Sequence, residues 1–369
     1  MEKILYMNIG DGESSYGNNS FLQEIVIQKT LPILKHTTIK AISNNDTILG
    51  QCFKIADMGC SSSKNTLLVV SNIIDIVQEG CKENNHKAPQ FQVFLNDLFG
   101  NDFGNIFKML PDFYATINNE KGTRYGRCFV SVAPGSFYDR VFPDQSLHLI
   151  HSSYSNHWLS RVPEGLENNA LNIYMAKTSP PNVFYTYAKQ FHFDFTKFLQ
   201  MRSEELVSRG CMVLVFIGRS SPDPTSDDCC SLLGLLAQSL VDMVKEVGLV
   251  RESDVNSFNM PVYFPCEDEV RNVIQDEGSF SVDKLTDFHV NWDPHDTNYT
   301  NNDQPIITQY SHGTNTAKVL RAVLEPLLTS HFGSFNIDDL FTRYGKHVAK
   351  HLSTKKTRYF NLAISLIKR

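Results

Sequence analysis

Short, continuously apolar segments alternate with longer segments of helical periodicity, and this alternation constrains the fold more than any other feature of the chain. Continuous apolar runs are typical of parallel strands buried on both faces, whereas half-exposed strands alternate apolar with polar residues. We expect strands at residues 52–58, 91–95, 127–133, 147–151, 211–217 and 359–367.

The segments between these runs carry apolar residues at helical spacing. We expect helices at 65–78, 187–207 and 232–247, the second ending before Gly210 and the third before Gly248. We interpret the phenylalanine stripe of the second helix as core packing. Alternation of strands and helices predicts an α/β fold with a doubly wound, mostly parallel sheet.

The alternation stops after residue 217. A turn-rich loop is expected at 222–228 (PDPTSDD), helical patterns continue to about 271 and return at 319–353, and the polar segment 292–312 suggests a mobile surface loop. These stretches predict a helical cap over the sheet, within a single unit of residues 1–369. Its sheet core would span about 50–220, 278–292 and 356–369, and its cap about 221–275 and 315–352.

Charge and composition argue against several classes of protein. The net charge is −6 and no long Lys/Arg run exists, whereas nucleic-acid binding needs a concentrated basic face. We find no signal-peptide pattern and no apolar run approaching the roughly 20 residues of a membrane span. Eight cysteines without a CxxC pair indicate free thiols. We therefore expect a soluble cytoplasmic protein, without nucleic-acid or membrane partners.

The first candidate ligand site is the segment IADMGCSSSKN at 55–65, where a strand ends in an acidic residue and runs through small residues into a helix. Nucleotide-binding sheets bring their backbone close to a ligand in this way. A dinucleotide fold would show three glycines, but only Gly59 is present, and the next strand-end acid, Asp97, comes 40 positions after Asp57. This disfavours a dehydrogenase and leaves an ordinary strand–turn–helix as the alternative.

The second candidate is FLNDLFGNDF at 94–103, in which Asp97 ends the next predicted strand. A carboxylate in this place can accept hydrogen bonds from both hydroxyls of a ribose. Capping a helix N-terminus is the alternative role for the same residue.

Two further segments, APGSFYDRVFP at 133–143 and HLIHSSYSNHWL at 148–159, place polar and aromatic residues directly after strands, where such sheets bind ligands. His148, His151 and His157 raise the alternative of a zinc site, but no carboxylate stands at ligand spacing and strand side chains alternate between faces. A serine hydrolase is disfavoured because PGSFY does not match the GxSxG motif. Phe137 follows Ser136 at the place where the motif needs another residue and then Gly.

These motifs together resemble the SABATH family of plant methyltransferases. The resemblance rests on MNIGDGESSYGNNSFLQ, IADMGCSSSKN, FLNDLFGNDF, PGSFYDRVFP, HSSYSNHWLS and NSFNMPVYFP, which occur in order from about residue 4 onward. It implies a class I, Rossmann-like methyltransferase that uses S-adenosylmethionine. Within the family the chain looks most similar to benzoate and benzoate/salicylate carboxyl methyltransferases, on the stretches VPEGLENN, NIYMAKTSPP, YAKQF and SLVDMVKEVGLV.

Carried over position by position, the resemblance implies three sets of site residues. The cofactor would contact Tyr16, Asp57, Cys60, Asn65, Asp97, Leu98, Ser136, Phe137 and Ser153, with Asp57 near its methionine end. The acceptor's carboxylate would be held by Gln23 and Trp158, in a pocket lined by Tyr154 and His157. A magnesium site of some family members would correspond to Asn169, Asn256, Phe258 and Asn259.

The chain departs from the family pattern at several of these places. Ser63 and Lys64 replace a Gly and a Pro, and because Gly adopts backbone angles that Ser resists, we expect reduced cofactor affinity. Asn256 stands where several members have Asp, which weakens the expectation of a bound Mg²⁺. Asn8 stands where several salicylate enzymes have Lys, and His157 where they often have Met.

The resemblance implies an enzyme that forms the methyl ester of a small aromatic carboxylic acid, benzoate and/or salicylate. No catalytic base is expected, because a carboxylic acid with a pKa near 4 is already ionised at neutral pH. Jasmonate or another carboxylic acid, or a xanthine nitrogen as in caffeine synthases, remain alternative acceptors. A paralogue that binds ligand without turnover is a third hypothesis, and a homodimer is the family expectation.

Overall fold

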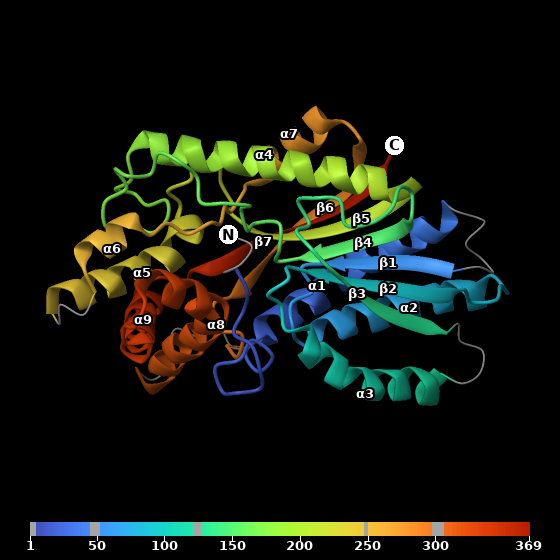
Figure 1. Ribbon diagram of the computed structural model, residues 1–369, viewed down its shortest axis with the longest axis horizontal. Helices are drawn as coiled ribbons and strands as arrows, with labels where there is room; N and C mark the ends of the chain where they lie inside the picture. The colour runs from blue at the N-terminus through green and yellow to red at the C-terminus, as the bar shows by residue number, and fades with distance from the viewer. Residues whose placement is uncertain (1–4, 45–51, 122–126, 247–249, 297–305) are drawn as a thin grey trace.

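A seven-stranded sheet with the order β3-β2-β1-β4-β5-β7-β6 crosses the molecule (Figure 1). Its strands are β1 (Cys52–Met58), β2 (Gln90–Asp97), β3 (Cys128–Pro134), β4 (Leu147–Ser153), β5 (Leu206–Gly218), β6 (Phe280–Asn291) and β7 (Arg358–Lys368). The computed structural model describes residues 5–44, 52–121, 127–246, 250–296 and 306–369. The pairings from β3 to β5 are parallel, and β7 is antiparallel to both neighbours, so β7 alone among the described strands runs the other way.

The sheet winds outward in both directions from β1, through β2 and β3 on one side and through β4 and β5 on the other. This arrangement confirms the predicted doubly wound, mostly parallel α/β fold. Phe53, Val93, Leu149 and Val213 in its central strands are buried, as continuous apolar runs predict. The reversal of strand order beside β1 matters for function, because open α/β sheets bind ligands at the carboxyl ends of the strands there.

Helices cover both faces of the sheet (Figure 1). On one face lie α1 (Phe21–Ser43), α2 (Asn65–Glu83) and α3 (Phe103–Lys121), and on the other α4 (Pro181–Glu205) and α7 (Glu267–Glu277). In α2 the predicted apolar stripe, which includes Leu67, Val70, Ile74 and Val77, is buried against the sheet layer.

Four more helices gather at one end of the sheet, α5 (Asp227–Glu246), α6 (Glu252–Ser257), α8 (Ile306–Phe332) and α9 (Ile337–Thr354) (Figure 1). The helices α8 and α9 approach each other closely at two glycines. A Cβ on Gly313 would lie only 2.1 Å from the carbonyl oxygen of Gly345, so backbone packs on backbone at this crossing. This group forms a helical cap at one end of the sheet, and α7, which the predicted cap limits included, lies on a face of the sheet instead.

The prediction that a helix extends to residue 207 and stops before Gly210 is wrong. The helix α4 ends at Glu205, and Gly210 lies inside β5, which begins at Leu206. The pairing of β4 with β5 shifts register between Leu147 and Leu149, so β5 bulges over its first residues. Arg202 and Glu205 form an ion pair with fully buried side chains (2.7 Å) at the helix end. The sequence pattern does not reveal such a pair.

The prediction of a mobile surface loop at 292–312 is also wrong for the part that the structure describes. Trp292 is buried and stacks on His351 with ring centroids 5.1 Å apart. Asp293 is buried and accepts a hydrogen bond from Asn315 (3.1 Å), and α8 begins at residue 306. Residues 297–305 lie outside the described residues.

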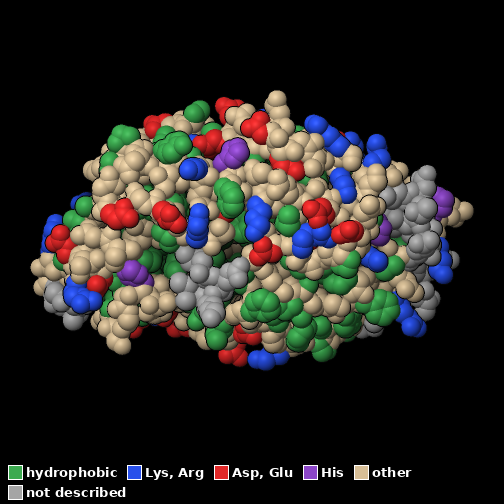
Figure 2. Space-filling model, turned by 45° about the horizontal axis from the view of Figure 1, so that its top comes forward, with side chains coloured by type: hydrophobic (Ala, Val, Ile, Leu, Met, Phe, Trp, Pro, Cys, Tyr) green, Lys and Arg blue, Asp and Glu red, His purple; other side chains and the backbone are tan. Residues whose placement is uncertain are grey.

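On the face seen in Figure 2, acidic and basic side chains are interspersed across the middle of the molecule, and hydrophobic side chains lie between them. Among the described residues, none of the helices has the length and apolar character needed to cross a membrane.

Candidate active site

Three adjoining cavities open at the carboxyl ends of β1, β2 and β4. The β2 cavity, of about 790 Å³, lies among the loops that follow β2, β3 and β4. The cap cavity, of about 650 Å³, lies between the end of β5 and helices α5 and α8, and the smaller β1 cavity lies at the end of β1. Tyr16, from the segment before α1, lines all three, so the cavities meet at its side chain.

The loop after β1 turns sharply at Gly59, which has a φ of 77°. A Cβ at this position would lie 2.1 Å from Ser155 Oγ, so a larger residue does not fit. The backbone N–H groups of Gly59 and Cys60 both donate to the carbonyl oxygen of Asn96, at 2.8 and 2.9 Å. These bonds fix the loop against the end of β2, beside the β1 cavity.

The two departures from the family pattern in this loop do not strain it. Ser63 is buried outside the left-handed backbone region, and its Oγ accepts a hydrogen bond from the backbone N–H of Asn65 (3.3 Å). Lys64 has a φ of −57°, and its ammonium pairs with Glu24 on α1 (3.0 Å). The reduced affinity expected from the missing Gly therefore has no backbone cause in this structure.

Asp57, at the end of β1, is buried and its two carboxylate oxygens have different partners. Thr66 Oγ1 of α2 donates to Oδ2 (2.6 Å), and His151 Nδ1 of β4 lies 2.8 Å from Oδ1. Asp57 and His151 are also paired in the register of β1 with β4. The carboxylate is thus fixed by two elements and lines the β1 cavity.

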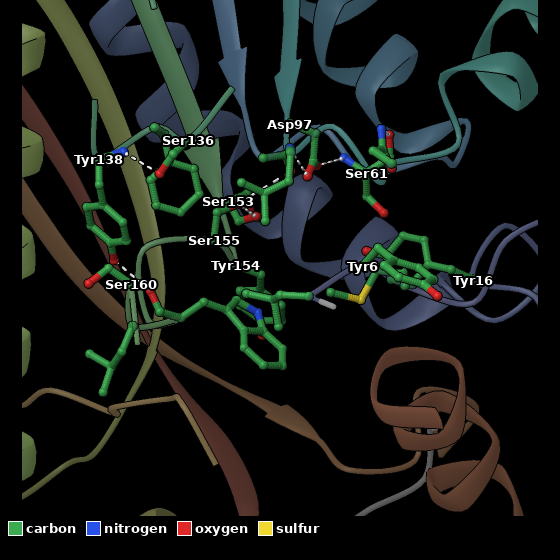
Figure 3. A pocket seen from close by; sticks show the side chains of 18 residues that line it. Tyr6, Tyr16, Ser61, Asp97, Ser136, Tyr138, Ser153, Tyr154, Ser155 and Ser160 are labelled. Carbon is green, nitrogen blue, oxygen red and sulfur yellow. Dashed lines mark hydrogen bonds between the residues drawn. The ribbon is translucent and has the colours of Figure 1, made fainter. Parts of the chain in front are cut away.

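Asp97, at the end of β2, lies in the wall of the β2 cavity. Its Oδ2 accepts a hydrogen bond from the backbone N–H of Ser61 (2.7 Å) and its Oδ1 from that of Leu98 (2.8 Å), as Figure 3 shows for Ser61. Burial, with a smaller contribution from the charge of Asp57, raises the pKa of this carboxyl to about 6. Tyr6 and Tyr16 face the same cavity from the N-terminal segment (Figure 3).

Two polar atoms at these cavities are buried without a hydrogen-bond partner among the described residues, Asn65 Oδ1 and Gln23 Oε1. Asn65 is nevertheless held in place, because its Nδ2 donates to the carbonyl oxygen of Ser20 (2.9 Å). Buried polar atoms in proteins normally have partners, so a bound ligand is the natural source of the missing bonds.

The far wall of the β2 cavity is formed by Ser136 and Phe137, after β3, and by Ser153, at the end of β4. The buried ion pair at the end of α4 holds the loop after β3 in place. Arg202 donates to the carbonyl oxygen of Phe137 (2.5 Å), and Glu205 accepts from the backbone N–H of Val141 (2.7 Å).

The cap cavity is lined mainly by apolar side chains, and the side chains there that carry polar atoms are Tyr16, Gln23, Tyr154, His157, Trp158 and Tyr359. The indole N–H of Trp158 makes no hydrogen bond within the described structure, while its backbone carbonyl accepts from Tyr138 Oη (2.6 Å). The Tyr154 hydroxyl donates to Asn361 Oδ1 on β7. The indole N–H and the Gln23 amide are therefore two of the groups available to a ligand in this cavity.

His157 is buried in the wall of the cap cavity, and burial lowers the pKa of its imidazole to about 3. The backbone N–H of Ile217 donates to Nδ1 (3.4 Å), so the neutral ring carries its proton on Nε2. The ring packs edge-on against Phe264, with centroids 5.9 Å apart.

The three histidines of the zinc alternative do not meet. His148 Nδ1 accepts from the backbone N–H of Lys54 (2.9 Å), His151 pairs with Asp57, and His157 faces the cap cavity. The described residues contain no cluster of three His, Cys, Asp or Glu side chains suited to a metal ion.

The residues of the family's magnesium site lie near one another, away from the three cavities. Asn169 Oδ1 accepts from Ser179 Oγ (2.7 Å), Asn259 Oδ1 accepts from Asn169 Nδ2 (3.2 Å), and Asn256 Oδ1 accepts from the backbone N–H of Leu171 (2.8 Å). Phe258 is buried and packs on Phe332. These amide oxygens are already paired with protein donors and carry no charge, so they do not fit a magnesium ion, which seeks carboxylates or phosphates.

Comparison with known proteins decides the family. A sequence model of the family described as SAM dependent carboxyl methyltransferase matches residues 2–369 of this chain. The chain belongs to this family. The predicted use of S-adenosylmethionine and the assignment as an enzyme are thereby confirmed.

Individual relatives of this methyltransferase cover the whole chain. It is 45% identical to a probable jasmonic acid carboxyl methyltransferase of Theobroma cacao, over 100% of this chain and 99% of that one. It is 44% identical to a benzoic acid/salicylic acid carboxyl methyltransferase of Petunia hybrida, over 99% and 98%. The structure of loganic acid methyltransferase with SAH superposes with a TM-score of 0.83 at 31% identity, covering 98% of each chain.

Sequence patterns missed one wall of the site. Val319, Leu320, Val323 and Leu324 of α8 line the cap cavity. Their spacing is that of any buried helix face, so it offered no signal that distinguishes a ligand wall from core packing. The contribution of Met7 from the N-terminal segment, which lines both large cavities, was also missed.

Proposed function

We propose that this methyltransferase forms the methyl ester of a small aromatic carboxylic acid, with benzoate and salicylate as the acceptors to expect. The observation that carries the proposal is the pair of available donors, Trp158 and Gln23, in a mainly apolar cavity that adjoins the proposed cofactor site. An apolar cavity with a few convergent polar groups suits a small ligand with one polar end.

The β1 and β2 cavities fit the cofactor. Asp97 would accept hydrogen bonds from the two ribose hydroxyls, and Leu98, Ser136 and Phe137 would line the space for the adenine. Around the β1 cavity the amino-acid end would be held by the residues Tyr16, Asp57, Cys60, Asn65 and Ser153. The unpartnered Asn65 Oδ1 supports this placement, because it needs a donor such as an ammonium.

When bound, S-adenosylmethionine supplies a methyl group on a sulfonium centre. Trp158 and Gln23 would hold the acceptor's carboxylate through N–H donors and aim one oxygen toward the junction of the cavities at Tyr16. Orientation of this kind contributes about 7–11 kcal/mol in favourable systems. No side chain is needed as a base, because the acceptor is ionised at neutral pH.

The aromatic side chains of the cap cavity support an aromatic acceptor. Tyr154, His157 and Phe264 pack edge-on in its wall, and such edges and faces pair well with a ring. Because His157 is neutral and carries its proton on Nε2, it adds a polar edge without placing a charge beside the carboxylate.

Jasmonate is the second candidate acceptor. The aliphatic α8 residues in the cap cavity suit a flexible hydrocarbon chain, and a relative of 45% identity is named for jasmonic acid. We further propose that residues 1–369 act as one unit with the core and cap limits predicted above, except that α7 belongs to the sheet layer. The cytoplasm as its compartment, and a homodimer as its assembly, are parts of the same proposal.

An acceptor panel with radiolabelled S-adenosylmethionine tests the proposal. The purified protein would be assayed with benzoate, salicylate, jasmonate and a xanthine, and kcat/KM compared. We expect the two aromatic acids to have the highest values. A higher value for jasmonate or the xanthine would reject the aromatic assignment, and no turnover of any acceptor would favour a paralogue that only binds ligand.

A further inference from the structure

The β1 cavity has an unusual balance of charge and hydrogen-bonding groups. Among the residues that the structure describes, its lining includes one carboxylate, that of Asp57, and neither Lys nor Arg. It also includes Asn65, whose buried Oδ1 lacks a partner among the described residues. A cavity with a carboxylate and unpaired acceptors suits a ligand group that is positive and rich in N–H donors, as a primary ammonium is.

His151 on β4 is buried and lies opposite Asp57 in the register of β1 with β4. It is 3% exposed, it lines the same cavity, and its Nδ1 lies 2.8 Å from Asp57 Oδ1. Because an ionised carboxylate only accepts, the ring must carry a proton on Nδ1. The other ring nitrogen, Nε2, makes no hydrogen bond within the described structure.

We infer that His151 is a positioning residue for the ammonium end of the cofactor and that it acts through Asp57. Thr66 and His151 each hold one oxygen of the Asp57 carboxylate, so this carboxylate cannot rotate away from the cavity. This inference rests on the proposed placement of the cofactor's amino-acid end in the β1 cavity.

The test compares two ligands that differ only at the amino-acid end. S-adenosylhomocysteine carries the ammonium and the carboxylate of the amino acid, whereas 5′-methylthioadenosine has the same nucleoside and thioether without either group. Calorimetry of both on the wild type and on His151→Leu separates a local effect from general damage. We expect His151→Leu to weaken the first ligand about 10- to 150-fold, the yield of one charge-assisted hydrogen bond, and to leave the second unchanged.

A pair of amide variants keeps the test informative if the Leu variant does not fold. An Asn side chain places its N–H near the position of Nδ1, and a Gln side chain places it near Nε2. We expect His151→Asn to retain most of the preference for S-adenosylhomocysteine and His151→Gln to lose it. Ser152→Ala is the matched control, since Ser152 is equally buried on β4 but donates to the carbonyl oxygen of Met58 (2.9 Å).

Three results would overturn the inference. They are an unchanged ratio of the two affinities in His151→Leu, an equal loss for both ligands, and a preference retained by Gln but lost by Asn. A wild type that binds both ligands equally well would instead reject the proposed place of the amino-acid end, and so identifies failure of the proposed function separately.

Discussion

The carboxylate of Asp97 accepts a 2.7 Å hydrogen bond from the backbone N–H of Ser61, which joins the end of β2 to the loop after β1. Ser61 has a φ of 53°, a left-handed conformation that few residues other than glycine adopt without cost. The bond therefore helps to hold two walls of the proposed cofactor site in one geometry.

Replacing Asp97 by Ala should abolish cofactor binding and leave the fold intact. The variant loses the proposed bonds to the ribose, each worth about 1.5–3 kcal/mol for a charged group, together with the anchor of Ser61. Calorimetry with S-adenosylhomocysteine measures the loss. Asp139→Ala, which removes an exposed carboxylate outside the cavities, is the control, and near-wild-type affinity of Asp97→Ala would contradict the assignment.

Cofactor affinity should fall as the pH drops below about 6, because burial raises the pKa of Asp97 to about 6 and the ribose hydroxyls need the ionised form. The effect on folding has the opposite sign. The folded pKa exceeds the ordinary value of 3.8, so this group favours folding below about pH 4 and loses that contribution as the pH rises through about 6. Calorimetric measurements of cofactor affinity between pH 5 and 7 should show an affinity that rises with pH for the wild type. The same measurements should show no such rise for Asp97→Asn.

Activity should not require Mg²⁺. The amide oxygens of Asn169, Asn256 and Asn259 already accept hydrogen bonds from protein donors, and none carries a charge. Initial rates measured in EDTA and in added Mg²⁺ should agree. A rate that collapses in EDTA and returns with Mg²⁺ would show that these residues rearrange around a metal.

The substitution His157→Met should shift the preference from benzoate toward salicylate. Met is a flexible apolar filler that packs well against rings, whereas the neutral His offers a polar edge. We expect a change of about 1–3 kcal/mol in relative kcat/KM, the usual yield of one pocket contact. Both acids are measured on the wild type and the variant, and an unchanged ratio in two folded enzymes removes His157 from the acceptor site.

The substitution Gly313→Ala should destabilise the protein, by about 1–3 kcal/mol, because the new Cβ would lie 2.1 Å from the carbonyl oxygen of Gly345. Gly234→Ala on α5 is the matched control. A Cβ there meets nothing within 4 Å, so the helix should gain up to about 1 kcal/mol. Urea unfolding measures the free energy of unfolding of both variants. If both variants were destabilised, or both stabilised, the close contact at Gly313 would be refuted.

The sequence predicted those parts of the fold whose physical signal is local. Continuous apolar runs located the central strands, and the acids that end two of them, Asp57 and Asp97, lie at adjoining cavities as expected for parallel strands. A glycine between a strand and a helix predicted the turn at Gly59, where only the absence of a side chain admits Ser155.

The errors came from tertiary partners that leave no local signal. The helical pattern of α4 continues past Glu205, yet the carbonyl oxygens of Glu204 and Glu205 accept hydrogen bonds from the segment before β4, and the chain becomes extended at Leu206. Asp293 belongs to a polar run that resembles a surface loop, yet His312 and Asn315 satisfy its carboxylate inside the protein. The α8 residues of the cap cavity became recognisable only when the fold brought them opposite Trp158.

The close crossing of α8 and α9 bears on how the choice of acceptor can evolve. The same helix that touches Gly345 through Gly313 also supplies Leu320 and Val323 to the cap cavity. Any substitution that moves α8 by a few tenths of an ångström would reshape that wall from a distance. Laboratory selection for new acceptors should therefore randomise positions on α9 as well as those that face the ligand, since neutral drift there can prepare new substrate ranges.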